Sequence, residues 1–282
     1  MAALLGFDVY SPSEIAERVS QVGVAKARLP IVPLVMLGML AGAFIALGSL
    51  YYVIVVADPA LPHALQRLLG GTVFSLGLLL VVVAGAELFT GNNLLAMAWA
   101  DGKLGTREVL FNWLVVCGAN LVGAVGVASM VYLAGHADAY AATYLKIAAA
   151  KTSLPLVQAF FSGVMCNVLV CIAVWMALAG RSVVDKAVAI VFPISAFVAA
   201  GFEHCVANMY FLSLAAMLQA AAGEPVALSG IARNLVPVIA GNIVGGSVLV
   251  ALVYYVIYRW PPRARGRSAS GAPNADQMPT VR

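Results

Sequence analysis

Two long apolar runs in this sequence are each interrupted near the middle by a carboxylate. Residues 68–100 contain Glu87 as their one charged side chain, and residues 187–223 contain only Glu203 and His204. Runs of 33 and 37 residues exceed the length of one straight membrane helix, which needs about 20 residues. A charge at the bilayer centre costs roughly 3 kcal/mol or more. The two runs therefore predict membrane helices that are broken at mid-membrane around a functional site.

The rest of the chain supplies four further membrane segments. The uncharged runs cover residues 29–57, 109–135, 152–180 and 234–258. The whole chain is 63% hydrophobic and 10% charged, far from a typical soluble domain. We predict an all-α membrane protein with six transmembrane helices, the second and fifth of them broken.

Charge and composition also predict the orientation and the domains. Twelve of the 16 Lys and Arg residues fall on the predicted side that holds both termini, so the positive-inside rule places both termini in the cytoplasm. We expect a cytoplasmic amphipathic helix at 1–28, a transmembrane channel domain at 29–260 and a disordered cytoplasmic tail at 261–282. Residues 135–152 are expected to form an outer loop. Membrane orientation accounts for the excess of basic residues, so we expect no nucleic-acid partner.

The two interrupted runs share a short motif. Gly85-x-Glu87 matches Gly201-x-Glu203, and each glutamate is followed five residues later by an asparagine, Asn92 or Asn208. Because each half contains three spans, the second half must enter the membrane from the opposite side. This arrangement is an inverted repeat. We place the repeats at about 29–135 and 152–260. The exposed N–H groups at the second part of each broken helix would suit an anion.

Both glutamates are expected to be structural. A bare carboxylate beside an anion path would repel the substrate, so we expect Glu87 and Glu203 to accept bonds from free backbone N–H groups of the breaks. A direct proton relay through them is the alternative. In the first broken run, we expect the helical parts at about 66–78 and 90–99.

Several motifs resemble the formate/nitrite transporter family. They are Gly-Ala-Glu-Leu-Phe-Thr-Gly-Asn at 85–92, Lys-Thr at 151–152, Cys-Asn-x-Leu-Val-Cys at 166–171, Gly-Arg-Ser-Val-Val-Asp-Lys at 180–186 and Ala-Gly-Phe-Glu-His-Cys-Val-Ala-Asn-Met at 200–209. The resemblance implies an aquaporin-like protomer in a homopentamer, located in the bacterial inner membrane. It also implies transport of small monovalent anions, with formate first and nitrite or hydrosulfide as the alternative. Lactate is a further possible substrate.

The same resemblance implies roles for individual residues. His204 resembles the central pore histidine, and Thr90 resembles its partner on the first broken helix. The remaining pathway residues it indicates are Phe74 and Phe197 at an outer constriction, Leu78, Leu88, Phe89 and Val170 at an inner slit, Lys151 in the outer vestibule and Asn167 beside the pore.

Alternatives remain open at this point. His204 could be a core histidine bonded to Thr90 with no proton role, and Lys151 could be an ordinary lysine that extends to the interface. An intramembrane enzyme using His204 and Glu203 would lack a nucleophile, metal cluster or cofactor motif, so we predict no enzyme, no cofactor and no metal. A pore for neutral solutes is disfavoured by the histidine and the lysine. Besides the anion, lipid and further copies of the chain are the expected partners.

Overall fold

The computed structural model describes residues 9–226 and 228–260, and every regular element in these ranges is helical. Six helices are long and apolar enough to cross a membrane. They cover Ile31–Val56, His63–Gly85, Thr106–Leu133, Leu156–Ala179, Val183–Ala200 and Leu228–Tyr258. The predicted six-helix membrane fold is therefore confirmed. The predicted tail at 261–282 lies outside the described residues.

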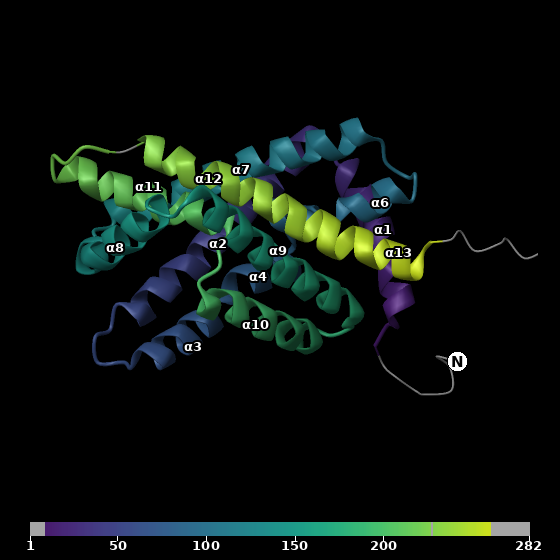
Figure 1. Ribbon diagram of the computed structural model, residues 1–282, viewed down its shortest axis with the longest axis horizontal. Helices are drawn as coiled ribbons and strands as arrows, with labels where there is room; N and C mark the ends of the chain where they lie inside the picture. The colour runs from purple at the N-terminus through teal and green to yellow at the C-terminus, as the bar shows by residue number, and fades with distance from the viewer. Residues whose placement is uncertain (1–8, 227, 261–282) are drawn as a thin grey trace, which may run out of the picture.

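The first half of the chain runs from α1 to α7 (Figure 1). Its elements are α1 Pro12–Ala27, α2 Ile31–Val56, α3 His63–Phe74, α4 Leu76–Leu80, the π-helix η2 Val81–Gly85, α5 Phe89–Asn92, α6 Leu95–Ala100 and α7 Thr106–Leu133. α1 begins at a capping box, in which the Ser11 hydroxyl accepts from the Glu14 backbone N–H and the Glu14 carboxylate accepts from the Ser11 N–H.

The second half repeats this order. Its elements are the 3₁₀ turn η3 Asp138–Tyr140, α8 Ala141–Thr152, α9 Leu156–Ala179, α10 Val183–Ala200, α11 Cys205–Ala221, α12 Leu228–Ile243, the π-helix η4 Val244–Leu252 and α13 Val253–Tyr258. The prediction of an outer loop at 135–152 is thus wrong for residues 141–152, which form α8. The alanine-rich sequence of α8 favours a helix because alanine has the highest helix propensity. α8 and α1 lie at opposite ends of the long axis (Figure 1).

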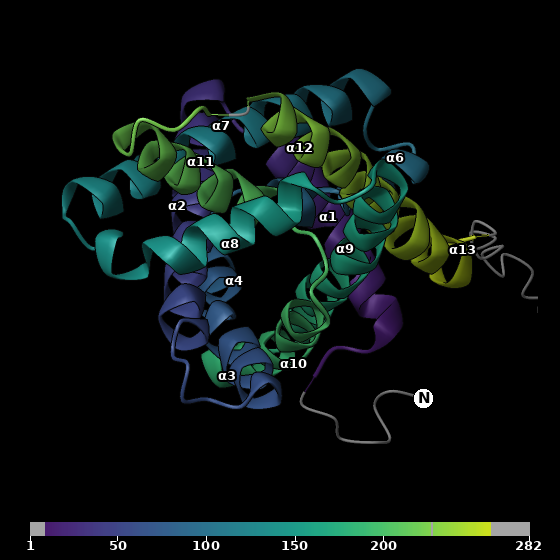
Figure 2. The same ribbon diagram turned by 60° about the vertical axis from the view of Figure 1, so that its left-hand side comes forward.

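The halves pack by the same close helix contacts. α2 packs along α7, and α9 packs along α12. A Cβ at Gly123 of α7 would lie 1.9 Å from the Met39 carbonyl oxygen, and a Cβ at Gly245 would lie 2.3 Å from that of Val164. These glycines therefore allow backbones to approach closely, as is common in membrane helix pairs. Turned by 60°, the molecule shows α3 and α10 side by side (Figure 2).

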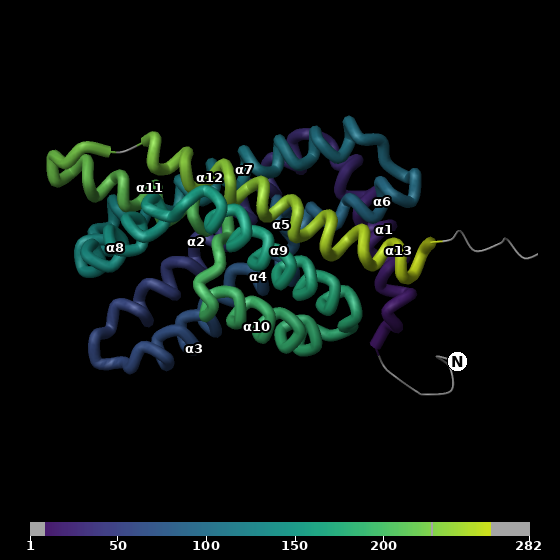
Figure 3. Tube along the Cα trace, viewed as in Figure 1, coloured from purple at the N-terminus to yellow at the C-terminus, as the bar shows by residue number. Residues whose placement is uncertain are grey.

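Both broken helices end at a glycine with positive φ, a conformation that glycine adopts without strain. Gly85 has φ of 84° and Gly201 has φ of 77°. The chain then runs without helix over residues 86–88 and 202–204 before α5 and α11 begin, and Figure 3 follows it through both interruptions. The break in the second helix is confirmed, but its first part continues to Gly85 rather than ending near residue 78, because η2 adds a π-helical turn.

Candidate functional site

One asparagine from α7 holds the first break in place. The Asn120 Oδ1 atom accepts a hydrogen bond of 2.9 Å from the Phe89 N–H, the first of α5. Its Nδ2 atom donates to the carbonyl oxygens of Gly38, at 2.7 Å, and Glu87, at 2.9 Å. A single side chain therefore pairs two backbone groups of the break, the Phe89 N–H and the Glu87 carbonyl oxygen, and ties them to α2 through Gly38.

Asn242 does the same at the second break. Its Oδ1 atom accepts from the Cys205 N–H at 3.0 Å, and its Nδ2 atom donates to the carbonyl oxygens of Gly163, at 2.8 Å, and Glu203, at 3.1 Å. The two asparagines thus make matching bonds in the two halves. We expected the glutamates to accept hydrogen bonds from backbone N–H groups of the breaks. The Phe89 and Cys205 N–H groups donate to the two asparagines instead.

Each glutamate has a lysine partner. Glu87 accepts from the Lys26 Nζ atom at 2.7 Å through Oε1 and from Asn92 Nδ2 at 2.8 Å through Oε2. Asn92 Nδ2 also donates to Asn112 Oδ1 at 3.0 Å. The carboxylate is therefore paired and hydrogen-bonded, as a buried charge requires.

The second half repeats this cluster. Glu203 accepts from Lys151 Nζ at 2.8 Å, from Asn208 Nδ2 at 2.6 Å and from Asn234 Nδ2 at 3.2 Å. Asn234 Nδ2 also donates to the Lys151 carbonyl oxygen at 3.0 Å. Lys151 is only 14% exposed in its side chain, so it is a partner of Glu203 at the break rather than a lysine that extends into solvent.

Three members of these clusters, Lys26, Asn112 and Asn234, are absent from the set of residues predicted from the sequence. A signal for two of them exists, because Asn112 precedes Asn120 by eight residues and Asn234 precedes Asn242 by the same number. Lys26 gave no comparable signal, because it lies before the first membrane span and reaches the site through its long side chain.

His204 and Thr90 meet between the two breaks, both of them buried. The His204 Nδ1 atom accepts from the Ala207 N–H at 3.2 Å, and Nε2 lies 3.0 Å from Thr90 Oγ1. A backbone N–H can only donate, so Nδ1 carries no proton and the proton of the neutral ring is on Nε2. A second proton on Nδ1 would face the Ala207 N–H, donor against donor. The structure therefore favours a neutral histidine whose Nε2–H donates to Thr90 Oγ1.

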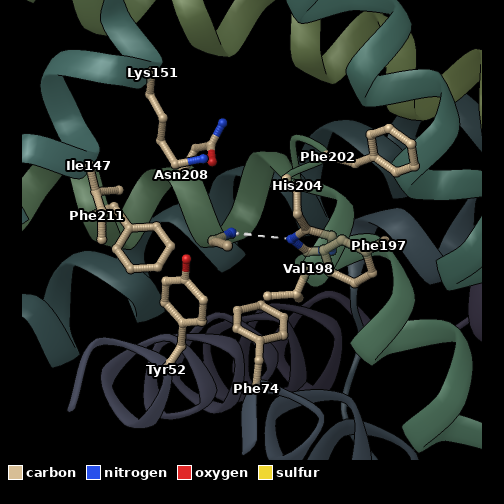
Figure 4. Close-up of a pocket in the computed structure, with 12 residues that line it drawn as sticks. Tyr52, Phe74, Ile147, Lys151, Phe197, Val198, Phe202, His204, Asn208 and Phe211 are labelled. Atoms are coloured by element: carbon tan, nitrogen blue, oxygen red, sulfur yellow. Dashed lines mark hydrogen bonds between the residues drawn. The ribbon is translucent and has the colours of Figure 1, made fainter. Parts of the chain in front are cut away.

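A small cavity of about 80 Å³ opens beside His204, and we call it the Lys151 vestibule (Figure 4). It is lined by Tyr52, Phe74, Ile147, Lys151, Phe197, Val198, Gly201, Phe202, His204, Ala207, Asn208 and Phe211. The Asn208 Oδ1 atom is buried and has no hydrogen-bond partner among the described residues. The cavity is thus mostly apolar with a few polar groups, as is typical of small-ligand sites.

A larger cavity of about 490 Å³ lies on the other side of the break, and we call it the Lys26 vestibule. Its lining includes Val22, Lys26, Leu37, Leu78, Val81, Gly85, Glu87, Leu88, Gly91, Asn92, Val174 and Leu178. Each vestibule thus contains a lysine and an asparagine from one Glu–Lys–Asn cluster. His204 lines the Lys151 vestibule, and Gly91, next to Thr90 in the chain, lines the Lys26 vestibule.

The predicted outer constriction is an aromatic contact. The rings of Phe74 and Phe197 meet edge to face with centroids 5.7 Å apart, and Phe197 stacks on the His204 ring at 5.9 Å. α3 and α10 bring these two phenylalanines together. Apolar side chains at this position would make a dry barrier to hydrated ions.

The residues predicted for the inner slit divide into two groups. Leu78 and Leu88 are buried and line the Lys26 vestibule. Phe89 and Val170 are buried in the main hydrophobic core and line neither vestibule. The inner slit itself stays a prediction for all four residues.

Asn167 lies behind Thr90. Its Nδ2 atom donates to the carbonyl oxygens of Thr90, at 3.2 Å, and Asn242, at 2.7 Å, and to Asn93 Oδ1 at 2.7 Å. Cys171 Sγ lies 3.3 Å from the same Thr90 oxygen. These contacts fix the backbone that presents the Thr90 hydroxyl to His204.

Comparison of the sequence with protein families gives the same result as the resemblance of its motifs. The family model described as "Formate/nitrite transporter" matches residues 13–256. The chain belongs to the formate/nitrite transporter family. As a formate/nitrite transporter, it is a membrane transport protein and not an enzyme.

Among relatives of this formate/nitrite transporter, the "Uncharacterized transporter YrhG" of Bacillus subtilis is 39% identical over 262 residues, which cover 90% of this chain and 96% of YrhG. The "Formate channel FocA" of Escherichia coli K12 is 35% identical over 272 residues, covering 89% and 95% of the two chains. A solved structure titled "Pentameric formate channel with formate bound" matches with a TM-score of 0.73 and 35% identity, over 81% of this chain and 97% of that one.

Proposed function

We propose that this formate/nitrite transporter conducts small monovalent anions, formate first, through a path that joins the two vestibules past His204. The observation that carries the proposal is the Nε2–H donor of a buried, neutral imidazole placed between the two helix breaks. The formate-channel names of FocA and of the formate-bound structure support formate as the substrate.

The vestibules supply charge without exposing a free carboxylate. Glu203 Oε1 accepts from Lys151, and its Oε2 accepts from Asn208 and Asn234. Both carboxylate oxygens are therefore hydrogen-bonded, and the negative charge is paired with the ammonium. Lys151 Nζ has three donors and, within residues 9–226 and 228–260, one acceptor. Its other N–H groups can therefore attract an anion into the cavity.

His204 then replaces water as the donor to the anion. An anion in the narrow centre loses its hydration shell. A hydrogen bond from Nε2–H to the anion, in place of the bond to Thr90 Oγ1, offsets part of that cost. Uptake of a second proton at Nδ1 requires the Ala207 contact to open. This charged form binds the anion more strongly and couples flux to pH.

The assembly and the orientation belong to the same proposal. The pentameric title of the similar structure and the exposed apolar faces of the spans support a homopentamer with one path in each subunit. The excess of basic residues supports a bacterial inner-membrane location with the Lys26 side in the cytoplasm.

The test is flux into liposomes loaded with wild-type protein and with His204→Asn. We expect wild-type formate flux that depends on pH, while His204→Asn, which keeps a donor but cannot titrate, retains part of the flux without the pH dependence. Nitrite and hydrosulfide measured side by side would rank the alternative substrates. Movement of water or glycerol with no anion flux would contradict the proposed function, and an unchanged pH profile in His204→Asn would contradict the role of the histidine.

A further inference from the structure

Arg67 lies at the edge of the Lys151 vestibule. Its side chain extends from α3, and Nη1 donates to the Ala199 carbonyl oxygen at 2.6 Å. Ala199 is in the last turn of α10, where carbonyl oxygens lack partners within the helix. The guanidinium is thereby held at the end of the helix that leads into the His204 break.

This guanidinium lies next to residues that line the cavity. A Cβ at Gly201, which lines the Lys151 vestibule, would lie 3.0 Å from Arg67 Nη1. Tyr52 is another residue of the lining. Figure 4 shows its hydroxyl directed into the cavity.

The charge of Arg67 is not compensated by an ion pair. Lys26, Lys151, Lys103 and Arg259 each pair with a carboxylate. Within residues 9–226 and 228–260, no carboxylate lies in ion-pair contact with Arg67, and its side chain is exposed. Its positive charge therefore raises the electrostatic potential in the solvent at the mouth of the Lys151 vestibule.

The position equivalent to Arg67 in the other half carries no charge. The spacing of 116 residues that relates Gly85 to Gly201 relates Arg67 to Val183 and Val83 to Ala199. Val183 and Val83 are exposed by 61% and 43%. The inverted repeat therefore carries a guanidinium at the end of one broken helix and a valine at the equivalent place of the other.

We propose that Arg67 is an anion-capture residue for the Lys151 mouth, where it raises the local concentration of small monovalent anions and so their rate of access from that face. The proposal rests on the proposed anion transport. A unit charge about 7 Å away in water changes local anion concentration about threefold at low salt, and added salt screens the effect. Uptake from the Lys151 face should therefore fall when added salt screens the charge of Arg67.

Two variants separate charge from structure. Arg67→Gln keeps an N–H donor for the Ala199 carbonyl oxygen and removes the charge, and Arg67→Lys keeps the charge. Vesicles are sorted by orientation with an affinity tag on the C-terminal tail, and initial formate uptake from the Lys151 face is measured at subsaturating formate and two ionic strengths. We expect Arg67→Gln to have about one third of the wild-type rate at low salt and the wild-type rate at high salt, while Arg67→Lys follows wild type.

Each other result overturns the inference in a recognisable way. An Arg67→Gln rate equal to wild type at low salt means that the charge does not capture anions. An equal loss at both ionic strengths means that Arg67 acts by holding α10, and a melting curve in detergent would then show a destabilised variant. Absence of anion flux in the wild type contradicts the proposed function itself, and the inference with it.

Discussion

The two halves of the molecule build the same support around two different centres. In both, a lysine, a glutamate and two asparagines form one cluster, and a further asparagine pairs the backbone of the break. The side chain that follows the glutamate differs, because it is Leu88 in the first half and His204 in the second. The repeated residues thus hold both breaks in the same way, while the residue that follows the glutamate makes the two centres different.

The clusters also differ in how far their polar groups are satisfied. Lys26 Nζ donates to Glu87 and, at 3.2 Å, to Asn92 Oδ1. Within the part of the chain that the structure describes, Lys151 Nζ donates to Glu203 alone, and Asn208 Oδ1 has no partner. Among the described residues, the cluster in the half that contains the histidine therefore has fewer of its polar groups paired than its counterpart.

The largest expected effect comes from removing the lysines one at a time. Lys151→Met leaves Glu203 charged and buried, so we expect a loss of about 3–5 kcal/mol in stability. Lys26→Met should cost less, because the Lys26 side chain is 29% exposed against 14% for Lys151 and water can reach the pair. Thermal unfolding in detergent would measure both.

The double variant Lys151→Met with Glu203→Gln serves as the control, because it removes both charges together and should recover much of the stability. Equal destabilisation by the two single lysine variants would show that the halves do not differ in the way their exposure indicates.

A smaller and equal pair of effects is expected at the two asparagines of the breaks. Asn120→Leu and Asn242→Leu each leave a buried backbone N–H, that of Phe89 or Cys205, without its acceptor. We expect each to cost about 1–3 kcal/mol. Hydrogen exchange of the two N–H groups, together with melting curves, would measure this. A large difference between the variants would indicate that one break is held by other contacts.

The smallest effect concerns α1, which has an extra attachment through Arg259 to Glu17 and Asp101. The Arg259 hydrogen bond lowers the pKa of Glu17 from 4.5 to about 2. A lowered pKa stabilises the docked helix fully above pH 4.5, and this contribution is lost only as the pH falls towards 2. We expect α1 to stay docked at pH 5.

Spin-label distances between α1 and α6 at pH 7.5 and pH 5 would check this, with Arg259→Gln as the variant that loses the attachment. The pair is partly exposed, so its loss should cost no more than about 1 kcal/mol. Release of α1 in the wild type at pH 5 would show that another titrating group controls the helix.

Much of the fold could be predicted from the sequence because the bilayer makes charges costly. Glu87 and Glu203 inside apolar runs, each two residues after a glycine, revealed both breaks. Helix α8 could not be predicted from hydropathy, since it does not cross the membrane. Lys26 itself and the pairing of Lys151 with Glu203 were missed because both lysines come from helices outside the broken runs, and only packing brings them to the carboxylates.

The place of α1 in the molecule has a practical consequence. Lys26, at its C-terminal end, is part of the wall of a vestibule, as Lys151 of α8 is on the other face. A protein shortened to begin at the first membrane span would keep all six spans and still lose the ammonium that neutralises Glu87. Expression variants and reporter fusions should therefore preserve the sequence from Ser11 onward, even though it precedes the first hydrophobic segment.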